Sequence, residues 1–397
     1  MEPPADPAPT GPSRRPRGRA TAVTAALLAG GALLAACGSG SPTVASTAVT
    51  TPTTAAPGGG ASSLRIEPPP TGTVGLTESG SPVLYPLFNL WIPKYHTQYP
   101  GISIVTSATG SGAGATAAMS GQVDIGASDS YLLPAQRQQN PDALNIPLVV
   151  SSLVVVYRVP GVRGHLSLTG KVLSAIYRGA VTRWDAAPIA SLNPGVKLPD
   201  VPIVTVHRSD DSGETFVFTQ FLSKTDPVWR NRFSFGTQVS WPSAAEQVAA
   251  GSADESLQDC ERTVGCVAYL ATSYLDRAVN AGLGEAAVQN EQGSFELPTA
   301  AAVSAVADGM ASRTPATGTI SLVDAPVAGG YPIVNYEYAI VVANQTDPTA
   351  AQAIRSFLEW SIDPADGNAP GLLSTLSFVP LPASVVTQSA AQVNRVR

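Results

Sequence analysis

The sequence predicts an α/β protein of two lobes, and three observations lead to this expectation. Segments typical of strands and helices alternate from residue 74 to residue 126, which indicates a mostly parallel sheet. Two apolar runs, at residues 151–157 and 331–342, are typical of buried strands that can carry a chain from one lobe to another. The chain has 397 residues, of which 13% are charged and 44% hydrophobic, so it can bury two cores.

The alternating region contains five expected elements and one loop. In chain order they are strand 74–77, helix 82–98, strand 102–107, a Gly/Ser loop at 109–114, helix 115–120 and strand 123–126. Pro86 and Pro93 should bend or interrupt the first helix. Ligands bind at the carboxyl ends of parallel strands, beside helix N-termini, so the loops after these strands are the first place to look for a site.

The two apolar runs also suggest how the chain is divided. Two crossings would make lobe 1 discontinuous, built from residues 74–156 and 336–397, with residues 157–335 inserted as lobe 2. The runs themselves would then form a hinge of two crossing strands.

The N-terminus has the pattern of a targeting segment. Four arginines precede an apolar run at residues 20–36, which is short and rich in small residues for a membrane span. The run ends in Leu-Ala-Ala-Cys37-Gly, which resembles a bacterial lipobox whose cysteine receives a lipid. We therefore expect a lipoprotein signal peptide at residues 1–36 and a lipid anchor on the outer face of the cell membrane; the alternative is an ordinary secretory signal with an incidental cysteine.

Residues 37–73 are expected to form a flexible tether. The segment is rich in Ser, Thr, Pro, Ala and Gly and nearly lacks charged and aromatic residues, so it cannot bury enough apolar area to fold.

The remaining cysteines, Cys260 and Cys266, form an even pair six positions apart. Outside the cytosol such a pair usually oxidises to a disulfide. A metal site is the alternative, but no histidine or third cysteine lies nearby in the sequence, so we expect no bound metal.

The charge distribution argues against nucleic-acid binding. The net charge is −6; residues 1–36 carry four arginines and two acidic residues, or +2, which leaves −8 for the rest. A basic footprint would be expected for a nucleic-acid-binding protein. An acidic chain can still bind a small anion, because local hydrogen-bond donors determine the affinity of a small site.

Three short segments are candidates for an anion site. In the first, Ser81 precedes a proline as a helix N-cap would, and the helix start could present N–H groups such as that of Val83. In the second, Ser111 lies in the Gly-rich loop and adds a hydroxyl donor. Ordinary caps and turns are the alternative explanation for both.

The third segment follows an expected strand at residues 201–206. Arg208 can bind an oxyanion through two N–H groups, and Asp210 could fix its direction. Ser212 then has the position of an N-cap for a helix through residues 216–222. The alternative is a surface salt bridge beside an ordinary cap.

Asp129, which follows the expected strand 123–126, is the most specific indication. A carboxylate beside an anion is repulsive unless a proton lies between them. Phosphate near neutral pH retains a proton that it can donate, whereas sulfate has none. Asp129 could instead only cap the next turn.

These segments together resemble the phosphate-binding lipoproteins of the phosphate-specific ABC transporter, of the actinobacterial type. The resemblance runs from about residue 75 to the C-terminus and rests on seven motifs in order: LYPLFNLW (84–91), TGSGAG (109–114), IGASD (125–129), GKVLSAIYRG (170–179), LNPGVKLP (192–199), HRSDDSGETFVFTQ (207–220) and YPIVNYEYAIV (331–341). It implies a two-lobed periplasmic-binding-protein fold of type II, high-affinity phosphate binding, and delivery to the permease and ATPase subunits of an importer, with no enzymatic activity and no cofactor.

The resemblance also implies a role for each matching residue. The phosphate would be bound by Ser81, Val83, Ser111, Asp129, Arg208, Ser212, Gly213 and Glu214, with Asp210 supporting Arg208. Asp129 would accept the phosphate proton, while Gly213 and Glu214 would donate backbone N–H groups. Three positions depart from the family: Pro82 replaces a usual Thr, Asp211 a common Gly, and Glu214 a common Thr or Asp.

Three other functions remain to be weighed. A secreted phosphatase would need a nucleophile with a base or a metal cluster; of the histidines His96, His165 and His207, only His207 adjoins the candidate site. A phosphate-binding sensor or adhesin uncoupled from transport has the same sequence features. A site for sulfate or molybdate is disfavoured by Asp129. We expect a monomer.

Overall fold

The computed structural model describes residues 66–243 and 246–397. The expected signal peptide, Cys37 and the expected tether up to residue 65 lie outside the described residues. Of the remaining tether residues, Glu67 contacts the folded body: Arg355 donates to its carboxylate through Nε at 2.5 Å and through Nη2 at 2.9 Å.

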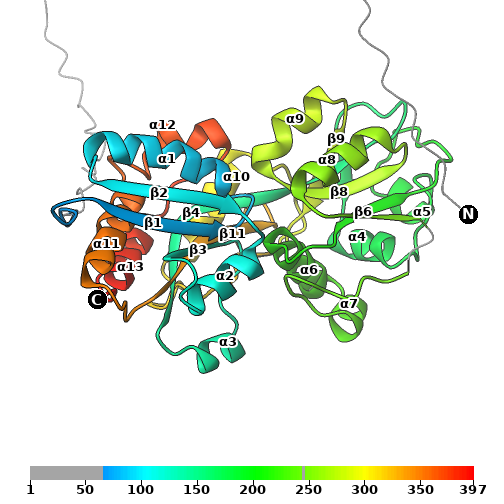
Figure 1. Ribbon diagram of the computed structural model, residues 1–397. Coiled ribbons are helices and arrows are strands. Elements are labelled where there is room, and N and C mark those ends of the chain that lie inside the picture. The colour runs from blue at the N-terminus through cyan, green and yellow to red at the C-terminus, as the bar shows by residue number, and fades with distance from the viewer. Residues whose placement is uncertain (1–65, 244–245) are drawn as a thin grey trace, which may run out of the picture. The chain divides into compact units, whose positions relative to one another are not determined.

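A mixed sheet organises lobe 1. In spatial order its strands are β2 (Ile102–Ala108), β1 (Val74–Gly80), β3 (Ile125–Ser128), β11 (Val334–Val342) and β4 (Ala143–Tyr157). β1 runs parallel to β2 and β3, whereas β11 is antiparallel to β3 and β4. The α/β prediction is confirmed, but the sheet is mixed and not mostly parallel as expected, because β11 inserts antiparallel between β3 and β4. The carboxyl ends of β1 and β3 meet at one edge of the sheet (Figure 1).

β4 continues into lobe 2. Its residues 153–157 pair with β8 (Cys266–Ala271), beside which lie β6 (Val204–Arg208) and β7 (Gln247–Ala250). β11 begins beside the point where β4 leaves lobe 1: the N–H of Leu153 in β4 donates to the carbonyl of Ile333, the residue before β11, at 2.9 Å. β4 therefore crosses between the lobes, whereas β11 pairs only with lobe 1 strands, so the second crossing, through the apolar run that ends in β11, remains a prediction.

The exact lobe boundaries remain predictions. The segment before the second crossing already contacts lobe 1, because Gln388 of α13 (Ala383–Val393) donates to the Thr314 carbonyl at 3.0 Å. Gln392 of the same helix donates to the Ala316 carbonyl.

The helix expected from residue 82, which Pro86 and Pro93 were to bend or interrupt, is the uninterrupted α1 (Tyr85–Gln98). Pro86 lies in its first turn, where a missing N–H removes no intrahelical bond, and Pro93 is accommodated inside it. The helix is held by aromatic packing on α11 (Pro348–Ile362), in which the Phe88 and Phe357 rings lie 5.9 Å apart. Tertiary packing therefore outweighs the local cost of Pro93.

Helix α2 (Ser111–Met119) begins earlier than expected, because most of the Gly/Ser loop is helical. A Cβ on Gly114 would lie 2.4 Å from the Ser79 carbonyl oxygen, so only glycine lets α2 approach β1 this closely. The approach brings the first turn of α2 to the carboxyl end of β1.

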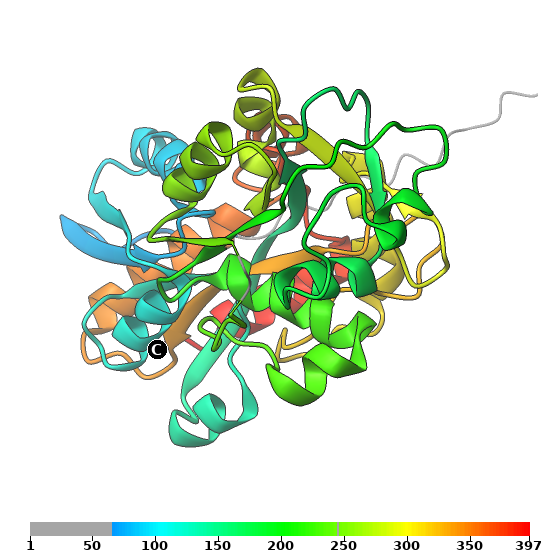
Figure 2. The same ribbon diagram turned by 90° about the vertical axis from the view of Figure 1, so that its right-hand side faces the viewer.

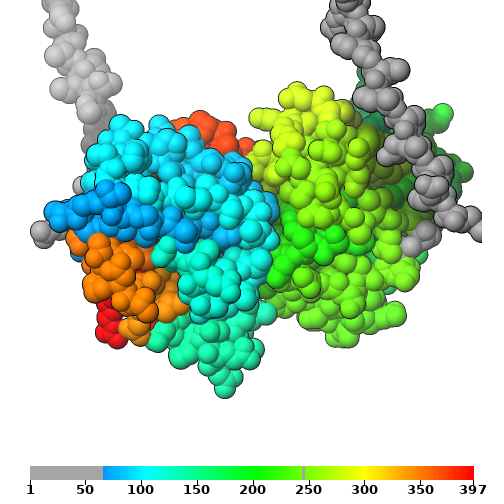
Figure 3. Space-filling model, viewed as in Figure 1, coloured from blue at the N-terminus to red at the C-terminus, as the bar shows by residue number. Residues whose placement is uncertain are grey.

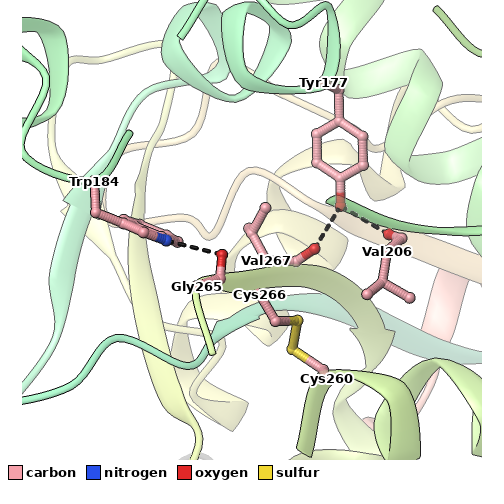
Figure 4. Close-up of a disulfide and its surroundings, with 7 residues drawn as sticks. All are labelled: Tyr177, Trp184, Val206, Cys260, Gly265, Cys266 and Val267. Atoms are coloured by element: carbon pink, nitrogen blue, oxygen red, sulfur yellow. Dashed lines mark hydrogen bonds between the residues drawn. A yellow bond between two sulfur atoms is a disulfide. The ribbon is translucent and has the colours of Figure 1, made fainter. Parts of the chain in front are cut away.

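Lobe 2 has helices on both faces of its strands (Figures 1 and 2). α4 (Gly170–Tyr177), α6 (Gly213–Thr225) and α7 (Pro227–Arg232) lie on one side, and α8 (Ala253–Arg262) and α9 (Leu275–Asn280) on the other. The predicted disulfide is confirmed: Cys260 and Cys266 join the last turn of α8 to the start of β8 (Figure 4), with their Cα atoms 5.3 Å apart. It lies beside buried bonds from Trp184 Nε1 to the Gly265 carbonyl at 2.9 Å and from Tyr177 Oη to the Val206 carbonyl at 3.1 Å.

The remaining elements complete the two lobes. They are α3 (Pro134–Gln139), β5 (Leu166–Leu168), α5 (Ala187–Ala190), β9 (Gly284–Gln289), β10 (Phe295–Glu296), α10 (Ala300–Ala311) and α12 (Pro370–Leu373), with short 3₁₀ turns at Thr272–Tyr274 and Ser374–Leu376. None of the helices within residues 66–243 and 246–397 has the length and apolar character of a membrane span.

Candidate functional site

The turn between β1 and α1 places Ser81 beside Asp129. The Ser81 hydroxyl donates to Asp129 Oδ1 and accepts from the N–H groups of Val83 at 3.0 Å and Leu84 at 3.3 Å. Ser81 thus caps the turn that leads into α1, although the helix itself begins at Tyr85. In this conformation the Val83 N–H is bonded to Ser81.

Ser111 and Asp129 come together at the carboxyl ends of β1 and β3. Ser111 is the first residue of α2, and its Oγ accepts the Asp129 N–H at 3.1 Å. Both side chains are buried. Because Ser111 Oγ already accepts a bond, it has its hydroxyl proton to donate, either to the Asp129 carboxyl, whose pKa this bond lowers, or to an anion.

Arg208, the last residue of β6, contributes a buried guanidinium, with 2% of its surface exposed. Nε donates to Asp210 Oδ1 at 2.6 Å and Nη2 to Oδ2 at 2.5 Å, while Nη1 donates to Glu214 Oε2. The backbone is fixed as well, because its N–H donates to the Tyr269 hydroxyl at 3.1 Å. Three of the five guanidinium N–H groups are engaged by these carboxylates, which leaves one on each Nη to bind an oxyanion.

The N-terminus of α6 closes the site. Ser212 is its N-cap, accepting the Thr215 N–H at 3.2 Å, so this prediction is confirmed. A Cβ on Gly213 would lie 2.4 Å from both Asp129 Oδ2 and Ser111 Oγ, so glycine is required for α6 to approach lobe 1 this closely. The first N–H groups of a helix have no intrahelical acceptor, and those of Gly213 and Glu214 begin this one.

The two lobes contact each other beside the candidate site. The Gly112 N–H of α2 donates to the Asp211 carbonyl at 3.3 Å, and Gln220 Nε2 of α6 donates to the Tyr131 hydroxyl at 2.7 Å. In the space-filling view the cyan surface of lobe 1 meets the green surface of lobe 2 along this seam (Figure 3). The lobes are therefore closed over the candidate site.

Burial sets the charge state of the site's acids. It raises the pKa of Asp129, while hydrogen bonds from Glu337 and Ser81 and the charge of Arg208 lower it. Burial also raises the pKa of Glu214 to about 7, with Arg208 opposing and Asp129 reinforcing the shift. Burial lowers the pKa of Arg208, but Glu214 and Asp210 outweigh it, so the net shift is upward and the guanidinium stays charged.

The structure brings together all eight residues expected at the site, and it adds two that the sequence reasoning missed. The hydroxyl of Tyr269 in β8 accepts a hydrogen bond from the backbone N–H of Arg208. It forms a second hydrogen bond with the Thr215 hydroxyl at 2.7 Å. Glu337 of β11 reaches the Asp129 carboxyl. The signal for Glu337 was present in the sequence: it is the one charged residue in the strand-like run 331–342.

His207 does not join the site. It precedes Arg208 in β6, where successive side chains point to opposite faces, and its ring packs on Trp241 with centroids 4.7 Å apart. Burial lowers its pKa. Within the described part of the chain, no three His, Cys, Asp or Glu side chains are grouped to hold a metal ion.

Comparisons with known proteins agree with this geometry. The family model of the PBP superfamily domain matches residues 42–365. The phosphate-binding protein PstS of Xylella fastidiosa is 28% identical over 323 residues, which cover 81% of this chain and 85% of that protein. The PstS of Methanocaldococcus jannaschii is 31% identical over 328 residues, covering 77% and 82%. The solved structure of PfluDING, a high-affinity periplasmic phosphate-binding protein bound with phosphate, has a TM-score of 0.64 at 21% identity and covers 80% of this chain and 93% of that one.

Two α/β lobes that are joined through β4 and enclose a buried cluster of hydroxyl, carboxylate and guanidinium groups define a periplasmic-binding-protein fold. The matched family model spans most of the chain. The chain belongs to the PBP superfamily and, within it, to the family of PstS phosphate-binding proteins.

Proposed function

We propose that this protein binds inorganic phosphate between its two lobes and delivers it to an ABC-type importer. The observation that carries the proposal is the meeting of three groups from lobe 1 (Ser81, Ser111 and Asp129) with Arg208 and the N-terminus of α6 from lobe 2, all of them buried. The names of the relatives support phosphate as the ligand.

The donors suit a tetrahedral oxyanion that carries a proton. Arg208 offers one N–H on each Nη, the first turn of α6 offers the N–H groups of Gly213 and Glu214, and Ser111 offers its hydroxyl. Asp129 is the acceptor for the ligand's proton. A monohydrogen phosphate satisfies both the donors and the acceptor, whereas sulfate satisfies only the donors.

Binding and closure are coupled in this proposal. The ligand docks first on Ser111 and Asp129, and closure then adds Arg208 and the α6 terminus. The ligand stabilises the closed state because only there do both sets of groups reach it. Tyr131–Gln220 and Gly112–Asp211 are contacts that form on closure.

The cellular setting is proposed from the sequence. Cleavage after residue 36 and lipidation of Cys37 would hold the protein on the outer membrane face by the tether that follows, as a monomer that docks on the permease of the importer. Cys37→Ser should release the processed protein from membranes or leave an unprocessed precursor. A processed Cys37→Ser protein that still fractionates with membranes would contradict the anchor.

Titration calorimetry of the purified protein with phosphate and then with sulfate tests the ligand. We expect tight phosphate binding and no measurable sulfate binding at neutral pH; absence of phosphate binding would overturn the proposal. A phosphate-ester hydrolysis assay on the same sample separates a binding protein from a secreted phosphatase, and we expect no turnover.

A further inference from the structure

Glu337 lies beside Asp129 because of how β11 pairs with β3. The two strands are antiparallel, with Tyr338 opposite Ser128, so the next position along each strand brings Glu337 to the level of Asp129. The pairing of β11 with β4 is irregular between Glu337 and Tyr338. Such irregularities re-aim side chains and are frequent beside functional sites.

The Glu337 carboxyl is buried, with 1% of the residue's surface exposed, and has few partners. Its Oε1 accepts from the Ser151 hydroxyl. Among the residues that the structure describes, neither Glu337 Oε2 nor Asp129 Oδ2 has a hydrogen-bond partner. The two carboxyl groups lie close enough to shift each other's pKa, and Ser111 also acts on the Asp129 carboxyl. Two carboxylate oxygens cannot make a favourable contact unless a proton lies between them.

We propose that Glu337 is a further specificity-determining residue of the phosphate site: its carboxyl stays protonated and donates its O–H in a hydrogen bond to Asp129, which keeps Asp129 an acceptor-only carboxylate. This inference rests on the proposed function. Asp129 then receives hydrogen bonds from Ser81, Glu337 and Ser111. Its two oxygens have about four acceptor sites, so it retains capacity for a ligand that brings its own proton.

The physical need for such a partner follows from burial. Desolvation favours the neutral form of Asp129, and a neutral Asp129 could donate a proton to sulfate and lose its selectivity. The hydrogen bond from Glu337 opposes this by lowering the pKa of Asp129. In the other direction, burial and then the charge of Asp129 raise the pKa of Glu337 well above its usual range, so Glu337 is the member that carries the proton.

Other charged groups act on the pair from lobe 2. Arg208 favours the ionised form of Asp129, and Glu214 disfavours ionisation of both Asp129 and Glu337. Asp210 is paired with Arg208 and acts on the site through it. The uncharged Ser81, Ser111 and Ser151 complete the surroundings.

Two variants distinguish the effect of the hydrogen-bond donor of Glu337 from the effect of its side-chain volume. Glu337→Gln keeps an N–H donor for Asp129 and an oxygen for Ser151, whereas Glu337→Leu keeps similar bulk and removes the donor. Phosphate and sulfate dissociation constants are measured for both variants and the parent from about pH 5.5 to about pH 9.5. Each variant's dissociation constant is divided by the parent's at the same pH. This ratio removes the pH dependence that comes from titration of the ligand and most of that from titration of Glu214.

Three results are expected. Glu337→Leu loses at least about tenfold in phosphate-over-sulfate preference at the acidic end, because Asp129 there becomes a donor. Glu337→Gln retains the preference. At the alkaline end the parent loses phosphate affinity relative to Glu337→Gln, since only the parent acquires a second negative charge. A Glu337→Leu protein with the parent's preference, or a Glu337→Gln protein that follows the parent through the alkaline range, overturns the proposal.

An infrared measurement tests the proton without any ligand. The difference spectrum between the ligand-free parent and Glu337→Gln should contain the carbonyl band of a protonated carboxylic acid at neutral pH. Its absence would overturn the proposal even if Glu337→Leu does not fold. A parent protein that fails to bind phosphate while the band is present would instead count against the proposed function alone.

Discussion

Arg208 and Asp210 form a two-point ion pair, with Nε 2.6 Å from Oδ1 and Nη2 2.5 Å from Oδ2. The pair fixes the plane of the guanidinium, because two parallel bonds allow one orientation only. Asp210 remains partly accessible, with 25% of its side chain exposed, whereas 1% of the Arg208 side chain is exposed. The guanidinium of Arg208 is thus held in one orientation in the buried site.

Replacing Arg208 tests its contribution to binding. Arg208→Ala removes two charge-assisted bonds to the anion, so we expect phosphate binding at least about a hundredfold weaker by calorimetry. Arg178→Ala is the matched control, because Arg178 pairs with Asp226 at 3.1 Å outside the candidate site. Unchanged affinity in Arg208→Ala would remove this residue from the site.

The contact between Tyr131 and Gln220 should slow the release of the ligand. The hydroxyl of Tyr131 accepts from Gln220 Nε2 at 2.7 Å across the lobes, and Gln220 Oε1 accepts from Ser321 at 2.5 Å. Tyr131→Phe removes one net hydrogen bond of the closed state, so phosphate should dissociate roughly three- to tenfold faster in stopped-flow measurements. Tyr85→Phe, at a partly exposed position, is the control. Equal dissociation rates in all three proteins would show that this contact does not hold the lobes closed.

The local parts of the site could be predicted from the sequence, and the parts that depend on strand pairing could not. Arg208, Ser212 and Gly213 lie within six residues, so their strand–turn–helix geometry is a local property. Glu337 meets Asp129 only because β11 inserts antiparallel beside β3, and no pattern near either residue encodes that neighbour.

The errors along α1 and α2 have a similar cause. The proline rules predict a bend or an interruption at Pro93; the helix is not interrupted, because packing of Phe88 and its neighbours on α11 stabilises all of it. The glycines at residues 110–114 are typical of a loop, yet Gly114 serves the close approach of a helix to a strand. In both places long-range packing decided the local structure.

Glu78 should make the protein less stable as the pH rises. Burial raises its pKa from the ordinary 4.5 to about 8, and the hydrogen bond from Thr106 opposes this shift only in part. The folded state therefore binds more protons than the unfolded state between those two values. The favourable contribution is complete below about pH 4.5 and is lost as the pH rises through about 8.

Glu78→Gln removes that dependence. At about pH 9 we expect its free energy of unfolding to exceed the parent's by up to about 5 kcal/mol, with little difference at acidic pH. Denaturant unfolding at a series of pH values measures this, and Glu291→Gln, at an exposed position, is the control. A constant difference between parent and Glu78→Gln at every pH would mean that Glu78 does not titrate in this range.

Asp129 should determine which tetrahedral anion the site accepts. Arg208, the serine hydroxyls and the α6 terminus would accept any such dianion of similar size. With phosphate, the Asp129 carboxylate accepts the ligand's own proton. With sulfate, unprotonated oxygens are forced together where water is excluded, at a cost of about 1–3 kcal/mol or more for the unpaired groups.

Asp129→Asn removes the repulsion and supplies an amide donor, so sulfate should gain at least about tenfold relative to phosphate in competitive titrations at neutral pH. Glu337→Leu should shift the preference in the same direction but mainly at acidic pH, because Asp129 without its bond from Glu337 is protonated there and becomes a donor. A phosphate-to-sulfate ratio unchanged in Asp129→Asn would exclude Asp129 as the selecting residue and leave shape and donor count as the only basis for discrimination.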